Sequence, residues 1–233
     1  MNAVAPTSIL LSVHMPKAGG TSFYRNLAAI YGPRLLWHNS DWVEVSGMEA
    51  DARRARHRAD LIGDPVAFRR NYDAIHGHFA AGKYLPLFPN ARLVTFVRDP
   101  FQHAVSSWEF GMRSASLPHP GHEALKARNL SVPELVEMYP NHQSAYVDDV
   151  PLEDFAMIGI FERYDESLAL FETLFGVPIP QRAMRENANP QRPSSGYVIS
   201  PEVRRAVERH RAADLDLYRR AVERFDHMRA AFA

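Results

Sequence analysis

The sequence contains no cysteine, which excludes disulfide bonds, cysteine nucleophiles and cysteine metal ligands. It also has no excess of either charge, because 27 Lys and Arg residues balance 27 Asp and Glu residues. A neutral chain lacks the overall positive field that attracts nucleic acid or anionic membranes, so we expect neither as a partner. A small basic pocket is still compatible with this balance.

Long apolar runs are also missing. No run approaches the roughly 20 residues that a membrane-spanning helix needs, and the N-terminus lacks the basic and apolar regions of a signal peptide. We therefore expect a cytoplasmic protein without a membrane span. The chain of 233 residues is 46% hydrophobic, which suits a single domain over 1–233 with a substantial core.

Four short apolar stretches have the length and composition of buried strands. They cover residues 8–14, 73–79, 91–100 and 154–164. Between them, apolar residues recur at helical spacing and predict helices at 21–32, 101–112 and 166–176. Strands that alternate with helices indicate an α/β fold of three layers, with a central parallel sheet flanked by helices.

The rest of the chain is less regular. A long closing helix is expected to begin with Ser200 as its N-cap and Pro201 in its first turn. Its apolar face is expected to comprise Val203, Val207, His210, Leu217, Ala221 and Phe225. Segments 33–70 and 111–152 have no clean hydrophobic period, and we expect loops and short helices there that form a lid or a substrate wall.

Residues 14–23 read HMPKAGGTSF and follow the first predicted strand. A loop that opens a helix presents main-chain N–H groups that attract an anion. A charge, two glycines and two hydroxyls in this loop suit a phosphate: Lys17, Gly19, Gly20, Thr21 and Ser22. The alternative is a tight turn in which Thr21 caps the helix. The loop does not satisfy the nucleotide consensus G-x-x-x-x-G-K-[ST], because its Lys precedes the glycines.

A second polar segment, VRDPFQHAVSS, follows the strand predicted at 91–100. Arg98 ends that strand, and Ser106 lies eight residues further on, about two helical turns away. A planar guanidinium and a serine hydroxyl both suit a phosphate. Alternatively, Arg98 forms a structural ion pair with Asp99 or another neighbour. Asp99 is not clearly placed to hold Mg²⁺, which disfavours an ordinary ATPase or GTPase.

Two of the 11 histidines, His76 and His78, lie at the end of a predicted strand. Their spacing of two puts both rings on one face of the strand. Imidazole accepts protons near physiological pH, so these side chains suit a general base, although a core histidine bonded to the main chain is the alternative. No third ligand has a suitable spacing, so we expect no metal. His14 and His103 are expected to be structural.

These segments resemble motifs of the sulfotransferases that use 3′-phosphoadenosine 5′-phosphosulfate (PAPS). HMPKAGGTSF resembles their 5′-phosphosulfate loop, and VRDPFQHAVSSW resembles their 3′-phosphate motif, in which Ser follows Arg by eight residues. HGHF and the closing segment VISPEVRRAVERHRAADLDLY resemble the hexuronic acid and heparan sulfate 2-O-sulfotransferase branch, with this chain as a soluble, bacterial-type member. The resemblance covers most of the chain in the same order.

The resemblance implies a P-loop-like fold with PAPS as the sulfuryl donor and adenosine 3′,5′-bisphosphate as the product. The five loop residues named above would bind the phosphosulfate group. Arg98 and Ser106 would bind the 3′-phosphate. Arg192 and Ser194, in the loop before the closing helix, would contact the nucleotide from above.

The expected reaction is in-line sulfuryl transfer to an acceptor hydroxyl, in which positioning and charge stabilisation do most of the work. By resemblance, His78 is the general base and His76 supports the site. Lys17 would stabilise charge on the leaving oxygen. We expect the acceptor to be a glycan or a small molecule. Two alternatives remain: a P-loop-like kinase that uses ATP, and a non-catalytic nucleotide- or glycan-binding protein of the same fold.

Overall fold

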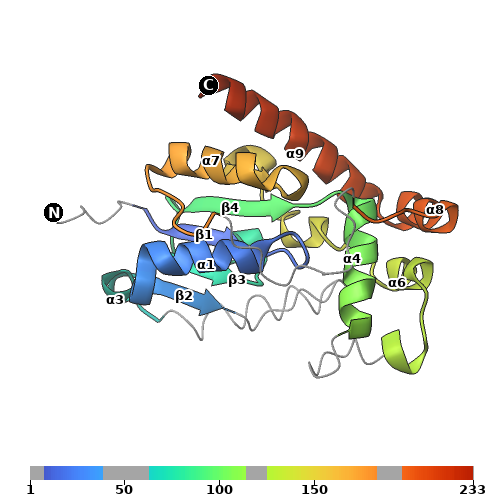
Figure 1. Cartoon of the computed structure of the whole chain (residues 1–233). Helices are drawn as coiled ribbons and strands as arrows, with labels where there is room; N and C mark the ends of the chain where they lie inside the picture. Colours follow the sequence, from blue (N-terminus) through green and yellow to red (C-terminus); the bar gives the residue numbers. More distant parts are fainter. Residues whose placement is uncertain (1–7, 39–62, 114–124, 183–195, 233) are drawn as a thin grey trace.

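The computed structural model of the chain describes residues 8–38, 63–113, 125–182 and 196–232 (Figure 1). Its centre is a five-stranded sheet in which all strands run parallel, in the order β2-β3-β1-β4-β5. The strands are β1 (Leu10–Val13), β2 (Leu35–His38), β3 (Ala74–Gly77), β4 (Arg92–Val97) and β5 (Phe155–Ile160). A parallel sheet flanked by helices confirms the predicted α/β class.

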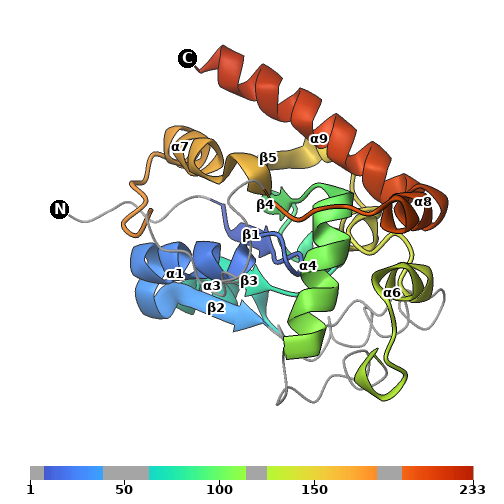
Figure 2. The same cartoon turned by 45° about the vertical axis from the view of Figure 1, so that its right-hand side comes forward.

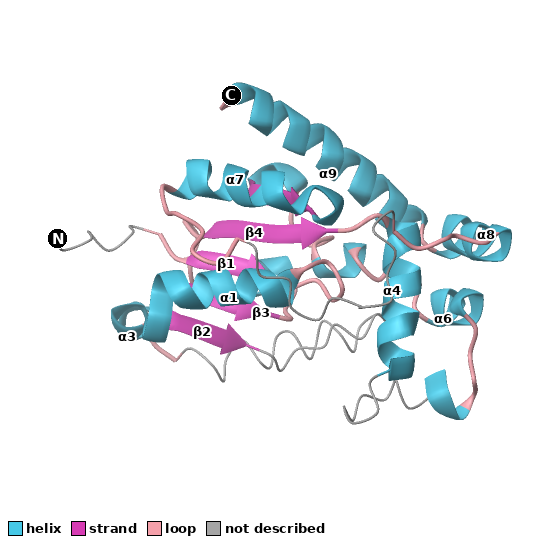
Figure 3. Cartoon of the chain, in the orientation of Figure 1, coloured by secondary structure: helices cyan, strands magenta, loops and turns pink. Residues whose placement is uncertain are grey.

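The helices surround this sheet on several sides. They are α1 (Gly20–Tyr31), α3 (Pro65–Asn71), α4 (Pro100–Arg113), α6 (Val132–Met138), α7 (Tyr164–Phe175), α8 (Pro201–His210) and α9 (Ala212–Ala231). Short 3₁₀ turns occupy Gly32–Arg34, Ala81–Tyr84, Ser144–Tyr146, Leu152–Asp154 and Phe161–Arg163. In Figure 3, α1 and α7 lie over one face of the sheet, while α9 runs along the edge strand β5, which it contacts.

The pattern of burial explains why the strands read as continuous apolar runs. All four residues of β1 and all four of β3 are buried, as is usual for central strands of a parallel sheet covered on both faces. The predicted ends of two helices are confirmed by glycines. α1 stops at Gly32, and α7 stops at Gly176, which adopts the left-handed conformation with φ 66°.

The expected single closing helix is two helices. Ser200 is the N-cap of α8, as predicted, because its hydroxyl accepts from the main-chain N–H of Val203. The helix ends at His210, Arg211 leaves helical conformation with φ −129° and ψ 38°, and α9 begins at Ala212. The prediction of one unbroken helix was therefore wrong.

The break at Arg211 lets the closing segment serve two separate cores. Val203 and Val207 of α8 pack with Ala104 of α4 and Val136 of α6 in a small cluster beyond the sheet. The apolar residues of α9 instead join the main core against the sheet: Leu217, Ala221 and Phe225. His210, expected on the same face, is half-buried at the end of α8.

The three polar segments of the sequence follow neighbouring strands. β1 lies between β3 and β4, and its register pairs Ser12 with His76 on one side and with Val94 on the other. The carboxyl ends of these strands therefore open at one edge of the sheet, where ligands bind in such folds. Figures 1 and 2 show α4 standing across this edge, with α6 and α8 beyond it.

Sequence periodicity did not reveal several short elements. The aperiodic segment 33–70 begins with β2 and ends with α3, and the segment 111–152 contains α6. In the part of the chain that the structure describes, none of the helices is long and apolar enough to cross a membrane.

Candidate functional site

The loop between β1 and α1 has an unusual main-chain conformation. Lys17 and Gly19 both lie in the left-handed region, with φ 61° and 87°, and a lysine rarely adopts it. Gly19 is the N-cap of α1, with no side-chain cap hydrogen bond, and the first turn of α1 has no acidic residue. The end of α1 thus keeps the positive dipole character that binds anions. The alternative role of Thr21 as the cap is wrong, because Thr21 lies inside α1.

The two loop glycines are required by packing as well as by conformation. A Cβ atom on Gly20 would lie 2.0 Å from Cδ2 of His14, so the imidazole fills the space that any side chain would need. A Cβ atom on Gly19 would lie 3.0 Å from the rings of Phe161 and Tyr164. We expected both glycines to admit a phosphate to the main chain; Gly20 also admits the ring of His14. Ser22 is buried.

Lys17 supplies the positive charge of this loop, and its environment lowers the pKa of its ammonium group. Its Nζ lies 3.9 Å from the centroid of the Phe110 ring, at a distance typical of a cation–π contact. Burial lowers the pKa of Lys17 to about 8, and the positive charges of Arg98 and Arg113 add to the effect. A bound anion would reverse this effect, because it favours the charged ammonium.

Arg98 reaches back from the end of β4 to the same loop. Its side chain is buried, and Nη1 donates to the main-chain carbonyl of Lys17 at 3.0 Å. The guanidinium carbon lies 4.4 Å from the ring centroid of Phe161 and 5.8 Å from that of Tyr197. The carboxylate of Glu162 lies nearby, with Nε of Arg98 3.9 Å from Oε1, which is long for a paired hydrogen bond.

The structural alternative for Arg98 was an ion pair with Asp99 or another neighbour, and the long contact to Glu162 is such a pair. Asp99 has main-chain partners. Its Oδ1 accepts from the main-chain N–H groups of Phe101 and Gln102, at 3.0 and 2.9 Å. Asp99 therefore caps the start of α4 in the manner of an N-cap residue. This role explains the acid at the end of β4 without any metal.

One stripe of α4 faces the loop. His103 Nε2 donates to the main-chain carbonyl of Pro16 at 3.1 Å, and Phe110 contacts Lys17. Ser106 lies three residues after His103 and four before Phe110, so it occupies the same helical face. Ser106 is buried. The structure thus brings Lys17, Arg98 and Ser106 to one region, as the sequence motifs predicted.

The two histidines of HGH have different partners. Nδ1 of His78 is 2.7 Å from the main-chain carbonyl of His14, which only accepts, so Nδ1 carries the hydrogen. Nε2 of the neutral His78 ring then holds the lone pair. Nδ1 of His76 is 2.8 Å from the hydroxyl of Ser12, across the strand pair. The rings of both histidines contact the ring of His14, at centroid distances of 4.3 Å for His78 and 5.0 Å for His76.

Burial keeps His76 and His14 neutral. The pKa of His76 is lowered to about 3, mainly by burial and secondarily by the neighbouring His78. Burial also lowers the pKa of His14 well below its usual value, with contributions from His78, His76 and Lys17. His14, expected to be structural, thus lies at the centre of the site. Within the described ranges, no group of three His, Cys, Asp or Glu side chains is placed to hold a metal ion.

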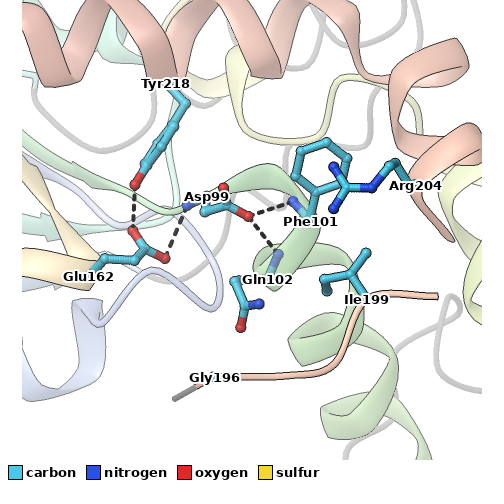
Figure 4. Close-up of a pocket in the computed structure, with 8 residues that line it drawn as sticks. All are labelled: Asp99, Phe101, Gln102, Glu162, Gly196, Ile199, Arg204 and Tyr218. Atoms are coloured by element: carbon cyan, nitrogen blue, oxygen red, sulfur yellow. Dashed lines mark hydrogen bonds between the residues drawn. The ribbon is translucent and has the colours of Figure 1, made fainter. Parts of the chain in front are cut away.

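A cavity of about 420 Å³ lies at the start of α4 (Figure 4). Its lining comes from α4, the Phe161–Arg163 turn, the segment before α8, and both closing helices: Asp99, Phe101, Gln102, Glu162, Gly196, Ile199, Arg204 and Tyr218. The Tyr218 hydroxyl donates to Glu162, and Glu162 accepts from the main-chain N–H of Asp99 (Figure 4). Burial raises the pKa of Glu162.

The segment before α8 is fixed next to this cavity. Gln102 pairs with the main chain of Tyr197 twice, donating to its carbonyl at 2.9 Å and accepting from its N–H at 2.8 Å. Arg192 and Ser194, expected to contact the nucleotide, lie outside the described residues. The structure therefore places the end of that loop, at Gly196 and Tyr197, against α4.

Sequence reasoning missed some residues around the site. Phe161 follows β5, and its place at the end of a parallel strand was a signal that could have found it. Gln143, whose side-chain amide bonds to the main chain of Arg98, belongs to no motif. Trp37 is 36% exposed and packs edge-to-face with Tyr24, with ring centroids 4.1 Å apart. Its ring centroid lies 6.1 Å from that of His14.

Comparisons with known proteins find resemblance in structure alone. No protein-family model matches the chain, and no curated protein matches it. It is similar to the crystal structure of mouse sulfotransferase SULT7A1 complexed with PAP, at 12% identity and TM-score 0.45, over 95% of this chain and 83% of that one. It is also similar to a sulfotransferase from Alicyclobacillus acidocaldarius, at 13% identity and TM-score 0.43, over 93% and 96% of the two chains.

Proposed function

We propose that the protein is a sulfotransferase that moves a sulfuryl group from PAPS to a hydroxyl of a carbohydrate acceptor. The observation that supports this most is the hydrogen bond that holds two cationic residues, Lys17 and Arg98, next to each other. Lys17 lies at the open start of α1, and Arg98 donates to the Lys17 carbonyl at 3.0 Å. Two adjacent anion positions suit a nucleotide that carries phosphate at both its 5′ and 3′ positions.

The residues present fit such a nucleotide. The start of α1, without a cap or an acid of its own, suits the 5′ group together with Lys17. The fork of Arg98 and the hydroxyl of Ser106 suit the 3′-phosphate. The rings of Phe161 and Tyr197 beside Arg98 offer flat apolar surface near the same position. An ATP site would need a ligand set for Mg²⁺, and Asp99, the acid at the end of β4, is engaged as a helix cap.

PAPS supplies, when bound, a sulfuryl group activated by its 5′-phosphate. His78 takes the proton of the acceptor hydroxyl at Nε2, because Nδ1 already carries a hydrogen bonded to the His14 carbonyl. The acceptor oxygen bonds to sulfur as the bond from sulfur to the 5′-phosphate oxygen breaks. Lys17 donates to that oxygen as it gains negative charge, and the start of α1 holds the phosphate behind it.

The exposed ring of Trp37 supports a carbohydrate acceptor. It lies on β2, next to the strand that leads to His78, and its edge faces the ring of His14. Exposed aromatic rings beside a polar group provide amphipathic contact area of the kind that sugars use. We propose that Trp37 forms part of the acceptor wall, which the sequence assigns to the segments 33–70 and 111–152.

Calorimetry tests the donor assignment. The protein should bind adenosine 3′,5′-bisphosphate more tightly than ADP or ATP, because the 3′-phosphate has its own site at Arg98. Added Mg²⁺ should not strengthen the binding of the bisphosphate. Preferential binding of ATP that increases with Mg²⁺ would overturn the proposal in favour of a kinase.

Assays of transfer then separate an enzyme from a binding protein. Mass spectrometry should detect sulfated products when PAPS and a panel of glycans and small hydroxylated compounds are incubated with the protein. Tight binding of the bisphosphate without transfer to any member of a broad panel would favour the non-catalytic alternative.

A further inference from the structure

A buried polar network connects the break between α8 and α9 to the two proposed anion positions. Its centre is the break itself, where Arg211 is 1% exposed and is among the largest fully buried side chains of the described residues. Asp214, in the first turn of α9, is 0% exposed. Neither residue belongs to the apolar face that was expected for the closing helix, so their burial needs a separate explanation.

One branch of the network leads to the loop that contains Lys17. Arg211 donates from Nη1 to Nδ1 of His103 at 3.0 Å, and Nε2 of His103 donates to the main-chain carbonyl of Pro16 at 3.1 Å. A guanidinium only donates, so Nδ1 of His103 must accept and the hydrogen must lie on Nε2. Arg211 therefore fixes the tautomer in which His103 binds the residue immediately before Lys17.

The other branch leads to Arg98. Asp214 Oδ1 accepts from the main-chain N–H groups of Gln143 and Ser144, at 3.0 and 2.7 Å. The amide of Gln143 then clamps the main chain of Arg98, because Oε1 accepts from its N–H at 2.9 Å and Nε2 donates to its carbonyl at 2.8 Å. Gln143 is itself buried.

The segment that contains Gln143 is also tied to the helix break by Asn141. Its N–H donates to the carbonyl of His210 at 3.2 Å, and its side-chain oxygen accepts from the N–H of Ala213 at 3.0 Å. Residues on both sides of Arg211 thus hold the 141–144 segment. The break in the closing helix is the point at which these contacts meet.

Stability alone is a weak reason for such a network. Burying opposite charges costs desolvation that their attraction often fails to repay, and well-packed apolar residues would stabilise the fold as well or better. Both branches end on main-chain atoms of the segments that present Lys17 and Arg98. We propose that Arg211 and Asp214 are positioning residues that hold the loop and Arg98 at the spacing required by the two phosphates of the nucleotide. This inference rests on the proposed function.

The two branches make separable predictions. Calorimetry on the full chain would use three probes: adenosine 5′-phosphate, adenosine 3′-phosphate and adenosine 3′,5′-bisphosphate. The bisphosphate compared with adenosine 3′-phosphate gives the gain in affinity from the 5′-phosphate. The bisphosphate compared with adenosine 5′-phosphate gives the gain from the 3′-phosphate. For the parent we expect a gain from both phosphates.

Single-branch variants should lose one gain and keep the other. His103→Phe, which keeps a ring of similar size, should reduce the gain from the 5′-phosphate on the order of tenfold and leave the gain from the 3′-phosphate within about threefold, as for loss of one charged hydrogen bond. Gln143→Met should do the reverse. Asp214→Asn, which keeps an oxygen for both N–H groups, should act in the same direction as Gln143→Met but more weakly.

Variants of Arg211 test the centre. Arg211→Met should reduce both gains, and Arg211→Lys, which restores a donor toward His103, should recover part of the 5′ gain. Arg205→Met is the matched control, because Arg205 is exposed on α8 and pairs with Glu202. It should leave both gains unchanged. Circular dichroism and thermal unfolding would check that each variant is folded.

The outcomes separate this inference from the proposed function. A parent protein that gains nothing from either phosphate would overturn both. Suppose instead that the parent shows both gains. If His103→Phe and Gln143→Met then reduce the affinity for all three probes equally, or for none of them, the positioning role alone would be overturned. Opposite losses in these two variants would support it even if Arg211→Met does not fold.

Discussion

The imidazole rings of His14 and His78 are stacked, with centroids 4.3 Å apart and an angle of 20° between their planes. The same two residues are joined by the hydrogen bond from Nδ1 of His78 to the main-chain carbonyl of His14. One contact fixes the plane of the His78 ring, and the other fixes the nitrogen that carries its hydrogen. A general base needs both, since its free nitrogen must meet the acceptor proton in a defined direction.

The first prediction concerns His78 as the base. His78→Ala should reduce the rate of sulfuryl transfer by about 10²–10⁴-fold, the usual contribution of a positioned base. Affinity for adenosine 3′,5′-bisphosphate should change little, because His78 faces the acceptor in the proposed arrangement. The rate of the parent should fall in acid, since a protonated imidazole cannot accept the hydroxyl proton. Rate constants and calorimetry on the same preparations would measure both effects.

His76→Ala is the comparison for this variant. It should affect the rate less, because His76 is buried against Ser12. A His78→Ala variant with the rate of the parent, alongside an inactive His76→Ala variant, would exchange the two roles. If neither change matters, a carboxylate within 33–70 becomes the next candidate base.

The second prediction concerns the proton of Lys17. Because its pKa is about 8 in the free protein, only part of the population is charged at pH 8. A bound phosphate favours the ammonium, so binding of adenosine 3′,5′-bisphosphate at this pH should take up a fraction of a proton. Calorimetry in two buffers of different ionisation enthalpy measures that uptake.

Two variants of Lys17 provide the controls. Lys17→Arg keeps the charge but remains protonated at pH 8, so it should bind the nucleotide without proton uptake. Lys17→Ala should mainly lower turnover, because the charge is needed most as the leaving oxygen becomes negative. Proton uptake that persists in Lys17→Arg would assign the titration to another group.

The third prediction concerns Arg98. Arg98→Ala should weaken the binding of adenosine 3′,5′-bisphosphate by about 1.5–3 kcal/mol, the range for a hydrogen bond to a charged group. Adenosine 5′-phosphate should lose much less, because it lacks the phosphate that Arg98 is proposed to hold. An unchanged affinity for the bisphosphate in a folded Arg98→Ala protein would remove Arg98 from the site.

The fourth prediction links the buried histidines to stability. The pKa of His76 is about 3 in the folded protein, against 6.5 for an ordinary histidine. Between these two pH values, the unfolded chain binds a proton at His76 that the folded protein does not bind. The free energy of unfolding should therefore decrease as the pH is lowered through this window, by about 1.4 kcal/mol per pH unit for this residue. His14 and His103, whose pKa values are also lowered by burial, should add to the slope.

His76→Asn tests this contribution, because asparagine does not titrate and keeps polar atoms near the Ser12 hydroxyl. Urea unfolding at pH 7 and pH 5 should show a smaller loss for the variant than for the parent, by about 2 kcal/mol. An equal loss in both proteins would mean that His76 is protonated in the fold or that its burial is relieved in acid.

The sequence predicted the parts of the site that depend on local pattern. Lys17, the histidine pair and Arg98 each follow a strand with a clear apolar run, and parallel strands bring their carboxyl ends to one edge. Ser106 was singled out because it follows Arg98 by eight residues, as in the motif that this segment resembles. Periodicity and the rule for parallel sheets gave the positions of these residues, and the resemblance gave their expected roles.

The remaining features depend on long-range contacts that no local pattern records. Arg211 reads as one more charged residue in a polar helix, and its burial arises from His103, 108 residues earlier in the chain. β2 has four residues inside an aperiodic segment, so its pairing with β3 had no periodic signal. The packing requirement for Gly20 was not predicted, because the motif does not show that the His14 ring folds back against it.

The last prediction concerns that glycine. Alanine is normally a better helix former than glycine by about 1 kcal/mol, so Gly20→Ala would be expected to stabilise α1 if only the helix mattered. Instead, the new Cβ would lie 2.0 Å from Cδ2 of His14, so the ring must move. We expect Gly20→Ala to lower the free energy of unfolding by about 1–3 kcal/mol, as overpacking does.

A control and a double mutant make this test specific. Gly63→Ala places a Cβ where no atom lies within 4 Å, so it should change stability little. In a His14→Ala background the space beside Gly20 is vacated, and Gly20→Ala should then cost less than in the parent, since contacting residues are not additive. Gly20→Ala should also lower the transfer rate more than the affinity for adenosine 3′,5′-bisphosphate, because the displaced ring of His14 no longer supports His78. Equal costs in the two backgrounds would show that His14 does not set the requirement for glycine.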